Sequence, residues 1–242
     1  MKNMSTKEYV LSILERNKGD FVTGMRLAED LGVSRNAIWK AVNELKKEGY
    51  DIRSVSNKGY SLDISSDILS VSSIREALSE HFTPDKAAII SESIIIFDSI
   101  DSTNKAAKLE YISGSMNKKI IIARKQTAGK GHGNKRFESP EGGIYMSIIL
   151  DADNKSKLTL SAASLGEAVK NIIEKLSGKK TTLDIKTNSI YIGSKKVCGI
   201  LTEYFADLET NTINGYVIGI GIRNINISKN KTIADILSAI LL

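Results

Sequence analysis

Residues 126–137 read QTAGKGHGNKRF, a loop in which glycines alternate with basic and polar side chains. Glycine lets a backbone approach a ligand closely and adopt positive φ. The basic groups among the glycines suit a ligand that carries a phosphate or another negative charge. Taken alone, the loop fits a solvated surface hairpin as well as a ligand-binding loop. The rest of the sequence is needed to distinguish the two. The glycines are Gly129, Gly131 and Gly133, and the basic groups that would meet such a ligand are Lys130, His132, Lys135 and Arg136.

Length and composition limit the class of protein. The chain has 242 residues, 41% hydrophobic content and a net charge of +6, enough for one large domain or two unequal ones. Cys198, the only cysteine, lies in an apolar stretch where we expect a packed thiol, and its isolation favours a reducing cytoplasm. With two separated histidines we expect no metal site. No signal segment and no run of roughly 18 apolar residues is present, so we expect neither export nor membrane insertion.

Residues 1–62 carry the pattern of a winged helix-turn-helix domain. Apolar residues at helical spacing predict helices that begin near residue 6, after Thr23 and after Ser34, and glycines end the second and third helices. Two β-like stretches, 50–55 and 60–62, follow on either side of the turn sequence SNKG and predict a hairpin. Helix, short turn, helix and hairpin is the order of elements in a winged helix.

The polar face of the third helix predicts a contact with operator DNA. Arginine, lysine and asparagine reach base edges and phosphates when a helix lies in the major groove. The alternative is a helical module for protein contacts whose polar face is simply solvated. We expect Trp39 to pack rather than to stack on a base. The predicted DNA-contacting residues are Ser34, Arg35, Asn36, Lys40 and Asn43 on the helix and Lys58 in the wing.

A serine-rich connector, residues 63–73, separates this domain from residues 74–242, which mix helical and β-like patterns. The mixture indicates an α+β domain built on a largely antiparallel sheet. We predict strands at 88–97, 119–123, 144–150, 182–192, 196–205 and 216–222, and a long amphipathic helix at 158–176.

Short motifs recur along the second domain in a definite order. They are DSTN at 101–104, the glycine–basic loop, SPEGGIYMSI at 139–148, IKTNSIY at 185–191, KKVCGILTE at 195–203 and GIGI at 219–222. Each is weak alone, but the ordered set resembles the bifunctional biotin–protein ligase and biotin operon repressor family (BirA type). The resemblance covers nearly the whole chain, including the winged helix.

The resemblance implies a winged helix followed by a biotin/lipoyl-ligase-like domain with a mostly antiparallel mixed sheet flanked by helices. It implies biotin or biotinyl-AMP as the ligand, with ATP and Mg²⁺ where ligase activity survives. In the family, the DSTN turn and the glutamine hold the biotin head group, and the loop folds over the adenylate phosphate. Carried over to this chain, the ligand-binding residues are Ser102, Thr103, Asn104, Gln126, Gly129, Lys130, Gly131, His132, Lys135, Asn188, Gly199, Gly219 and Gly221.

This chain departs from the family pattern at the residues that would contact the phosphate and the activated carboxylate. Lysines and a histidine replace arginines of the loop, and the planar fork that binds phosphate bidentately is lost. The family's lysine of Lys-Trp-Pro-Asn-Asp, which contacts the activated carboxylate and phosphate, aligns with Lys186 only across a one-residue gap. Without the gap it falls on Ile185, and in either case Ser189 replaces the aspartate. The family's small C-terminal β-barrel is expected to be absent.

We therefore expect a cytoplasmic DNA-binding regulator that senses biotin, biotinyl-adenylate or a related acyl molecule, with ligase activity weak or lost. A liganded chain is expected to form a homodimer on DNA. The alternative is an active bifunctional ligase that makes biotinyl-AMP from biotin and ATP and transfers biotin to a lysine of a carrier protein. A third hypothesis is a regulator for a lipoyl or coenzyme-A-related ligand.

Overall fold

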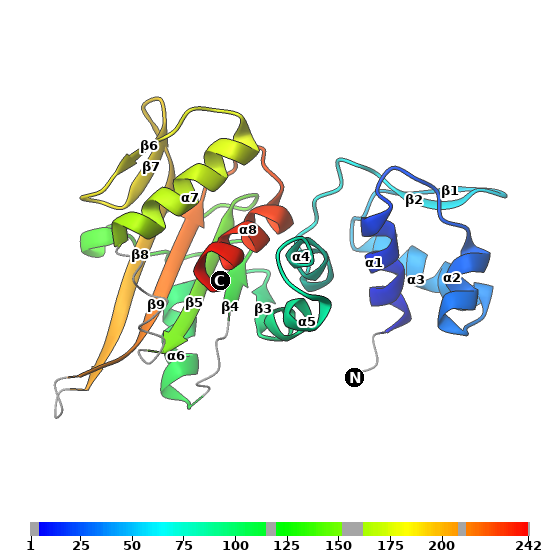
Figure 1. Ribbon diagram of the computed structural model, residues 1–242, viewed down its shortest axis with the longest axis horizontal. Helices are drawn as coiled ribbons and strands as arrows, with labels where there is room; N and C mark the ends of the chain where they lie inside the picture. Colours follow the sequence, from blue (N-terminus) through cyan, green and yellow to red (C-terminus); the bar gives the residue numbers. More distant parts are fainter. Residues whose placement is uncertain (1–4, 115–119, 152–161, 208–211, 242) are drawn as a thin grey trace.

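The computed structural model describes residues 5–114, 120–151, 162–207 and 212–241 (Figure 1). The N-terminal domain is a winged helix-turn-helix, as the sequence predicts. Its elements are α1 (Thr6–Arg16), α2 (Gly24–Leu31), α3 (Arg35–Lys47), β1 (Ile52–Val55) and β2 (Gly59–Leu62).

Side chains at the helix starts explain why these helices begin where they do. Ser5 and Glu8 form a reciprocal capping box at α1, Thr23 accepts a backbone hydrogen bond at α2, and Ser34 accepts one from the Ala37 amide at α3. Gly32 ends α2 in the left-handed region, at φ 64°. The apolar faces meet in one small core, which includes Val10, Leu14, Leu27, Ile38, Leu45 and Leu62.

The second domain is built on a seven-stranded sheet in the order β3-β4-β5-β9-β8-β7-β6. Only β3 and β4 are parallel, and every other neighbouring pair is antiparallel, so the predicted mostly antiparallel mixed sheet is confirmed. The strands are β3 (Ile94–Phe97), β4 (Ile120–Ala123), β5 (Ile144–Asp151), β6 (Thr182–Asp184), β7 (Ser189–Ile192), β8 (Lys195–Asp207) and β9 (Thr212–Ile222).

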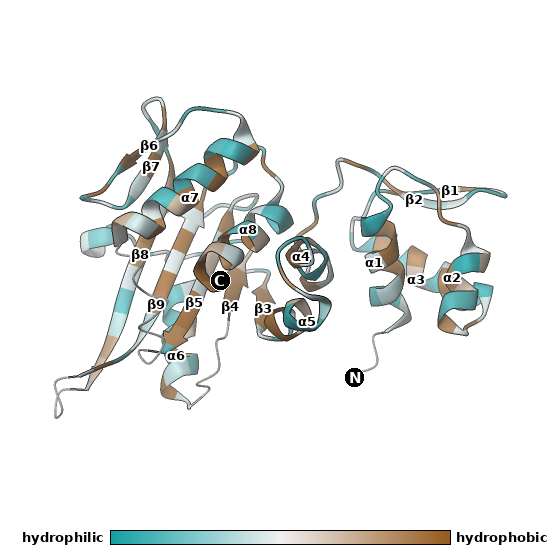
Figure 2. Cartoon of the chain, viewed as in Figure 1, coloured by the Kyte–Doolittle hydropathy of each residue, from teal (hydrophilic) through white to brown (hydrophobic). Residues whose placement is uncertain are grey.

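Most of the helices of this domain cover one face of the sheet. They are α4 (Val71–Leu78), α5 (Pro84–Glu92), α7 (Ala162–Ser177) and α8 (Lys229–Leu241), and their apolar residues join the main core with alternate residues of the central strands. In Figure 2 the outward side of α7 is hydrophilic, whereas the strands beneath it are mostly hydrophobic. The other face is packed by α6 (Thr103–Ile112) through Ala107, Ile121, Ile149 and Val217. The part of that face that α6 leaves uncovered carries the candidate site.

Two of the strand predictions were wrong in detail. The predicted strand at 88–97 is a helix, α5, followed by the four-residue β3, because Pro84 at the first helical position starts a helix that runs through the apolar residues. The predicted strand at 182–192 is a hairpin, β6 and β7, and residues 185–188 form its turn. Asn188 in that turn has φ 47°. No helix was predicted at residues 229–241, where the structure has α8.

The remaining predicted elements agree with the structure within a few residues. The helix predicted at 158–176 corresponds to α7, although its first residues, 158–161, lie outside the described residues, as does Lys119 of the strand predicted at 119–123. The predicted connector at 63–73 is less separate than expected. Leu69 is buried in the main core of the second domain, and α4 begins at Val71.

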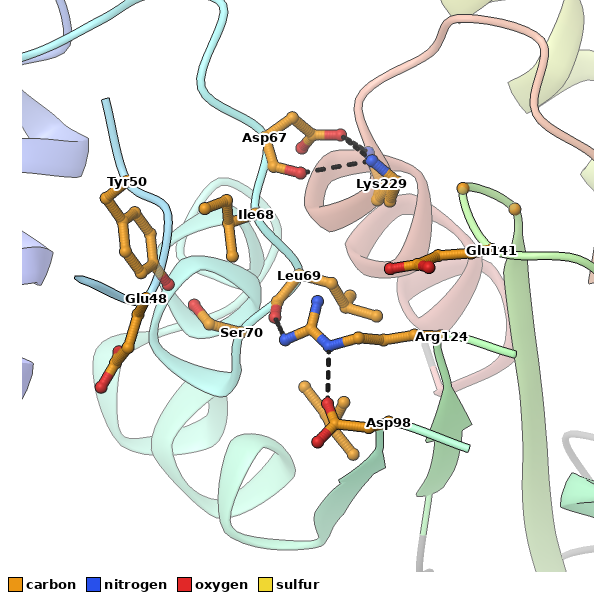
Figure 3. A pocket seen from close by; sticks show the side chains of 13 residues that line it. Glu48, Tyr50, Asp67, Ile68, Leu69, Ser70, Asp98, Arg124, Glu141 and Lys229 are labelled. Carbon is orange, nitrogen blue, oxygen red and sulfur yellow. Dashed lines mark hydrogen bonds and ion pairs between the residues drawn. The ribbon is translucent and has the colours of Figure 1, made fainter. Parts of the chain in front are cut away.

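The connector is bound to the second domain beside a cavity of about 650 Å³ between the two domains (Figure 3). Arg124 donates a hydrogen bond to the Leu69 carbonyl over 2.7 Å and pairs with Asp98 over 3.1 Å. The Lys229 amide donates to Asp67 over 2.7 Å. On the far side of α4, Arg16 of α1 pairs with Glu76 over 2.8 Å. Of these contacts, the Arg16–Glu76 pair joins the winged helix to α4, and the others fix the connector on the second domain.

No helix within the described ranges is long and apolar enough to span a membrane. The same ranges contain no group of three or more His, Cys, Asp or Glu side chains that could hold a metal ion.

Candidate functional site

A pocket opens on the sheet face that α6 leaves uncovered, between the start of α6, the glycine–basic loop and the middle of β8 and β9. It brings together ten of the thirteen residues that the sequence assigned to the ligand. These are Ser102, Thr103, Asn104, Gln126, Lys130, Gly131, His132, Gly199, Gly219 and Gly221. Segments up to about 120 residues apart therefore meet at one place, as the family resemblance implied.

A buried hydrogen-bond network fixes the polar wall of this pocket. The Thr103 amide donates to Gln126 Oε1 over 2.8 Å, and Gln126 Nε2 donates to Ser139 Oγ over the same distance. Ser147, which is fully buried on β5, lies 2.8 Å from Thr103 Oγ1 and donates to Asn104 Oδ1 over 2.6 Å. Each side chain holds its neighbour, so the amide and hydroxyl groups are fixed in orientation.

Glu203 extends the network to the edge of the pocket. Asn104 Nδ2 donates to Glu203 Oε2 over 2.8 Å, and Lys108 donates to the other carboxylate oxygen. Burial alone would raise the pKa of the Glu203 carboxyl, but the hydrogen bonds from Lys108 and Asn104 hold that pKa below its usual value. Glu203 therefore stays ionised at neutral pH and keeps the Asn104 amide in one orientation.

Glycines of β8 and β9 form the floor of the pocket, but protein side chains occupy the space above them. A Cβ atom on Gly219 would lie 2.1 Å from Asn104 Oδ1, and a Cβ atom on Gly221 would lie 2.4 Å from the ring of Phe137. The same ring is 3.0 Å from the Cβ position of Gly199. These glycines are thus required in the described conformation to seat Asn104 and Phe137.

The glycine–basic loop is a short hairpin that ends in a turn at residues 132–134. Gly131 N donates to the Lys135 carbonyl over 2.7 Å, and Phe137 N donates to the Gly129 carbonyl over 2.8 Å. Of the loop glycines only Gly133 has positive φ, at 64°. The side chains of Lys130, His132 and Lys135 are exposed, and Lys130 and His132 line the pocket.

The free volume of the pocket is only about 40 Å³. Sites for drug-sized molecules usually enclose roughly 300–1,000 Å³. The ring of Phe137, which lies 6.5 Å from the Tyr145 ring in an edge-on arrangement, occupies part of the space above the glycines. A ligand of the size of biotin fits only after this ring has left the glycine floor. The cavity between the domains is larger, but none of the predicted ligand residues lines it.

Three residues assigned to the ligand and the predicted catalytic lysine do not line the pocket. Gly129 and Lys135 lie in the loop behind it. Asn188 is half-buried, and its Oδ1 lies 3.3 Å from the Cβ position of Gly166 on α7. Lys186 is exposed in the β6–β7 turn, where its amide donates to Asp184 Oδ1 over 3.0 Å. The roles predicted for these four residues remain predictions.

Lys196, which was not among the predicted site residues, lines the pocket. It is half-buried at the start of β8, and its Nζ lies 5.8 Å from the centroid of the Phe137 ring. Ser147, Glu203 and Phe137 were missed as well. The signal for Ser147 was present, because a single hydroxyl in an otherwise apolar buried strand needs a hydrogen-bond partner.

Cys198 is fully buried on the helix-covered face of the sheet, as predicted. Burial raises the pKa of its thiol from 9.0 to about 12. We expect no reaction with Ellman's reagent in the native state at pH 8 and one equivalent of reaction after unfolding, because the thiolate is the reactive form. Rapid stoichiometric labelling of the native protein would contradict the described packing. The raised pKa also means that the contribution of this thiol to stability is present below pH 9 and is lost as the pH rises toward 12.

The exposed face of α3 carries the predicted DNA-contacting residues. Arg35, Asn36 and Lys40 are exposed, Asn43 is half-buried, and Lys58 is exposed in the turn between β1 and β2. The Ser34 hydroxyl caps the helix. Trp39, which we expected to pack, lies on this face with 54% of its surface exposed. The expectation failed because Trp39 follows buried Ile38 by one position, which turns it out of the core.

Comparisons with known proteins agree with this division of the chain. An HTH domain profile matches residues 6–61. The profile of the biotin/lipoate A/B protein ligase family matches residues 96–223, which include every residue that lines the pocket. The chain belongs to the biotin/lipoate A/B protein ligase family. Its winged helix and its family domain together confirm the resemblance to bifunctional ligase/repressors.

Two curated relatives match most of this chain. The chain is 37% identical over 227 residues to the bifunctional ligase/repressor BirA of Bacillus subtilis (strain 168), covering 91% of this chain and 65% of the relative. It is 30% identical over 207 residues to that of Escherichia coli (strain K12), covering 84% and 60%. The chain thus spans about 65% or less of the length of these relatives.

A solved structure supports the fold of the family domain. The biotin acetyl coenzyme A carboxylase synthetase of Helicobacter pylori, crystallised with biotinylated ATP, superposes with a TM-score of 0.52 at 24% identity. The match covers 61% of this chain and 73% of the other.

Proposed function

We propose that this protein is a DNA-binding transcriptional regulator whose ligase-like domain binds biotin or biotinyl-adenylate, with slow or no ligase turnover. The observation that carries the proposal is the convergence of Thr103, Asn104 and Gln126 with the glycine–basic loop on one pocket, in a chain that begins with a winged helix.

The polar wall suits the head group of biotin. A ureido group offers one carbonyl acceptor and two N–H donors, and it needs buried hydroxyl and amide partners. Ser102, Thr103 and Asn104 are each at least 93% buried, and Gln126 is held beside them. If the Phe137 ring moved away, the glycines of β8 and β9 beneath it would be exposed. The bicyclic ring of biotin could then lie on this apolar surface. The loop cations would then face a carboxylate or phosphate.

Slow turnover is supported by the positions of the basic groups. Lys130 and Lys135 stand where the resemblance implies arginines, and a lysine cannot bind phosphate through a planar fork. Lys186 is exposed outside the pocket. Removal of one contact to a transition state typically costs ~10²–10³ in rate. ATP, when bound, would supply the activated phosphate, and the loop residues of this chain would orient it.

The segment that follows the glycine–basic loop would couple the ligand pocket to the winged helix. Residues 141–143 lead from the loop into β5 and line the cavity between the domains, opposite connector residues 67–70 (Figure 3). If the loop moves when a ligand enters, residues 141–143 would move with it. They would then shift the connector that links the winged helix to the second domain. We infer that ligand binding biases dimerisation, so that two winged helices meet two half-sites of operator DNA.

Biotin-dependent exchange between ATP and pyrophosphate tests the assignment. With the Bacillus subtilis relative as the positive control, we expect an exchange rate at least ~100-fold lower for this chain. An exchange rate equal to that of the relative, followed by transfer to a carrier domain, would instead establish a working ligase.

That second candidate function has one observation in its favour. Lys196 places a cation inside the pocket, although at a position other than the one expected from the family motif. An active ligase would also take Mg²⁺-ATP and a carrier-protein lysine as substrates.

A further inference from the structure

Trp39, the only tryptophan of the chain, lies on the surface that the proposed function assigns to DNA. It is the fifth residue of α3, and 54% of its surface is exposed. Within the described residues its ring contacts neither another aromatic ring nor a cation. Tryptophan is highly buried on average in folded proteins, so an indole in this position is an apolar surface that a partner would cover.

Helical spacing places Trp39 at the centre of a polar surface. Arg35 and Asn36 precede it by four and three residues, and Asn43 follows it by four, so all three flank the indole on one side of α3. The opposite side of the helix is buried in the small core through Ile38, Ala41, Val42 and Leu45. The indole therefore faces solvent together with the predicted DNA contacts.

The polar groups around the indole have no partners of their own. In the described ranges no hydrogen bond or ion pair is formed by the side chains of Arg35, Asn36, Lys40 and Asn43. By contrast, Lys7, Arg16 and Arg53 of the same domain are each paired with a carboxylate. Two unpaired cations and two unpaired amides around one indole complement the charge of DNA, which presents phosphates beside its major groove and base edges within it.

The chemistry of the major groove determines what an indole can recognise there. Base edges present hydrogen-bond donors and acceptors, which suit arginine and asparagine, and one apolar group, the C5-methyl of thymine. The first turns of a recognition helix contact base edges. We propose that Trp39 recognises sequence in operator DNA by packing its indole ring on the methyl group of a thymine. This inference rests on the proposed binding of DNA.

Duplexes that lack single methyl groups test the proposal. The probes are a duplex that the full chain selects from a random-sequence library with biotin present, and copies in which one thymidine at a time is replaced by deoxyuridine. The replacement removes the methyl group and keeps the base pair. We expect gel shifts to show at least one copy that binds wild type roughly fourfold more weakly than the parent duplex, because burial of one methyl group is worth about 0.8 kcal/mol.

Variants of α3 then assign this preference to the indole. Trp39→Ala should bind the parent duplex more weakly and should bind the parent and the sensitive copy equally, because the methyl group has lost its contact. Trp39→Phe should retain a preference for the parent. Arg35→Ala should weaken both duplexes alike and keep the roughly fourfold preference. Ile89→Ala, which shortens an exposed apolar side chain on α5, is the control and should change nothing.

Thermal unfolding of the variants shows whether they are folded, and we expect midpoints close to wild type because more than half of the indole is exposed. A preference that Trp39→Ala keeps in full would overturn the proposal, as would a wild-type protein that is sensitive to no thymine methyl. Equal weakening of all duplexes by Trp39→Ala would place the indole on the sugar–phosphate backbone and overturn it as well. If the library yields no duplex that wild type binds, the proposed binding of DNA and this inference are both wrong.

Discussion

Gly219→Ala is expected to weaken the binding of biotin roughly 100-fold. The added Cβ would lie 2.1 Å from Asn104 Oδ1 and 2.8 Å from its Cγ, so the amide has to leave its place. Asn104 would then lose its hydrogen bonds with Ser147 and Glu203, and the ligand would lose the Asn104 amide. Loss of two such bonds at about 1–1.5 kcal/mol each corresponds to a roughly 100-fold weaker affinity, measurable by calorimetric titration.

The same substitution should lower the free energy of unfolding by about 1–3 kcal/mol in urea denaturation, because overpacking forces side chains to move. Gly193→Asn is the control, since nothing lies within 4 Å of its Cβ position and asparagine tolerates its φ of 58°. In the double variant Gly219→Ala, Asn104→Ala the clash is removed, so stability should partly recover while biotin binding does not. Recovery of binding in the double variant would contradict a role for Asn104 in the pocket.

Arg35→Ala is expected to weaken binding to operator DNA by roughly 10- to 100-fold, or about 1–3 kcal/mol. Arg35 is the first residue of α3 and is exposed beside Asn36 and Trp39 on the face that the sequence assigns to DNA. If it contacts a phosphate, the slope of log K against log salt concentration should fall by about one. Gel shifts at several salt concentrations measure both quantities.

The chain supplies its own optical probe for this test. Trp39 is the only tryptophan and lies in the middle of the face, so bound DNA should change its fluorescence. Lys175→Ala, which removes an exposed cation from α7 in the other domain, serves as the charge-matched control and should leave DNA affinity unchanged. An Arg35→Ala variant with wild-type affinity and unchanged salt dependence would show that this face is not the DNA contact.

Much of the fold could be predicted because local signals agree with one another. The side chains of Thr23 and Ser34 accept hydrogen bonds at the starts of α2 and α3, and Gly32 ends α2 in the left-handed region, as predicted. The helical spacing of Ile233, Ile236, Leu237 and Ile240 is a signal of the same kind for α8, although no helix was predicted there. The strand predicted at 88–97 failed because an apolar run of that length fits a buried helix as well as a strand.

The pocket was predictable in its membership but not in its internal contacts. The motif residues Thr103, Gln126 and Gly219 meet as expected, because the family resemblance carries information that spans the whole chain. Nothing in the local sequence indicates that Phe137 rests on Gly221, since that contact joins the loop to a strand more than 80 residues away. A β-bulge at Val197, which brings Lys196 to the pocket, depends on the register between β7 and β8. Register of this kind is set by tertiary packing.

A calorimetric titration of the wild-type protein with biotinyl-adenylate tests most directly the central claim that the pocket binds this ligand. We predict one site per chain with a Kd of about 10 µM or tighter, which is a binding free energy of roughly −7 kcal/mol or more favourable. Biotin should compete for the same site. The absence of any binding heat at about 1 mM of either ligand, with an intact folded protein, would contradict the account.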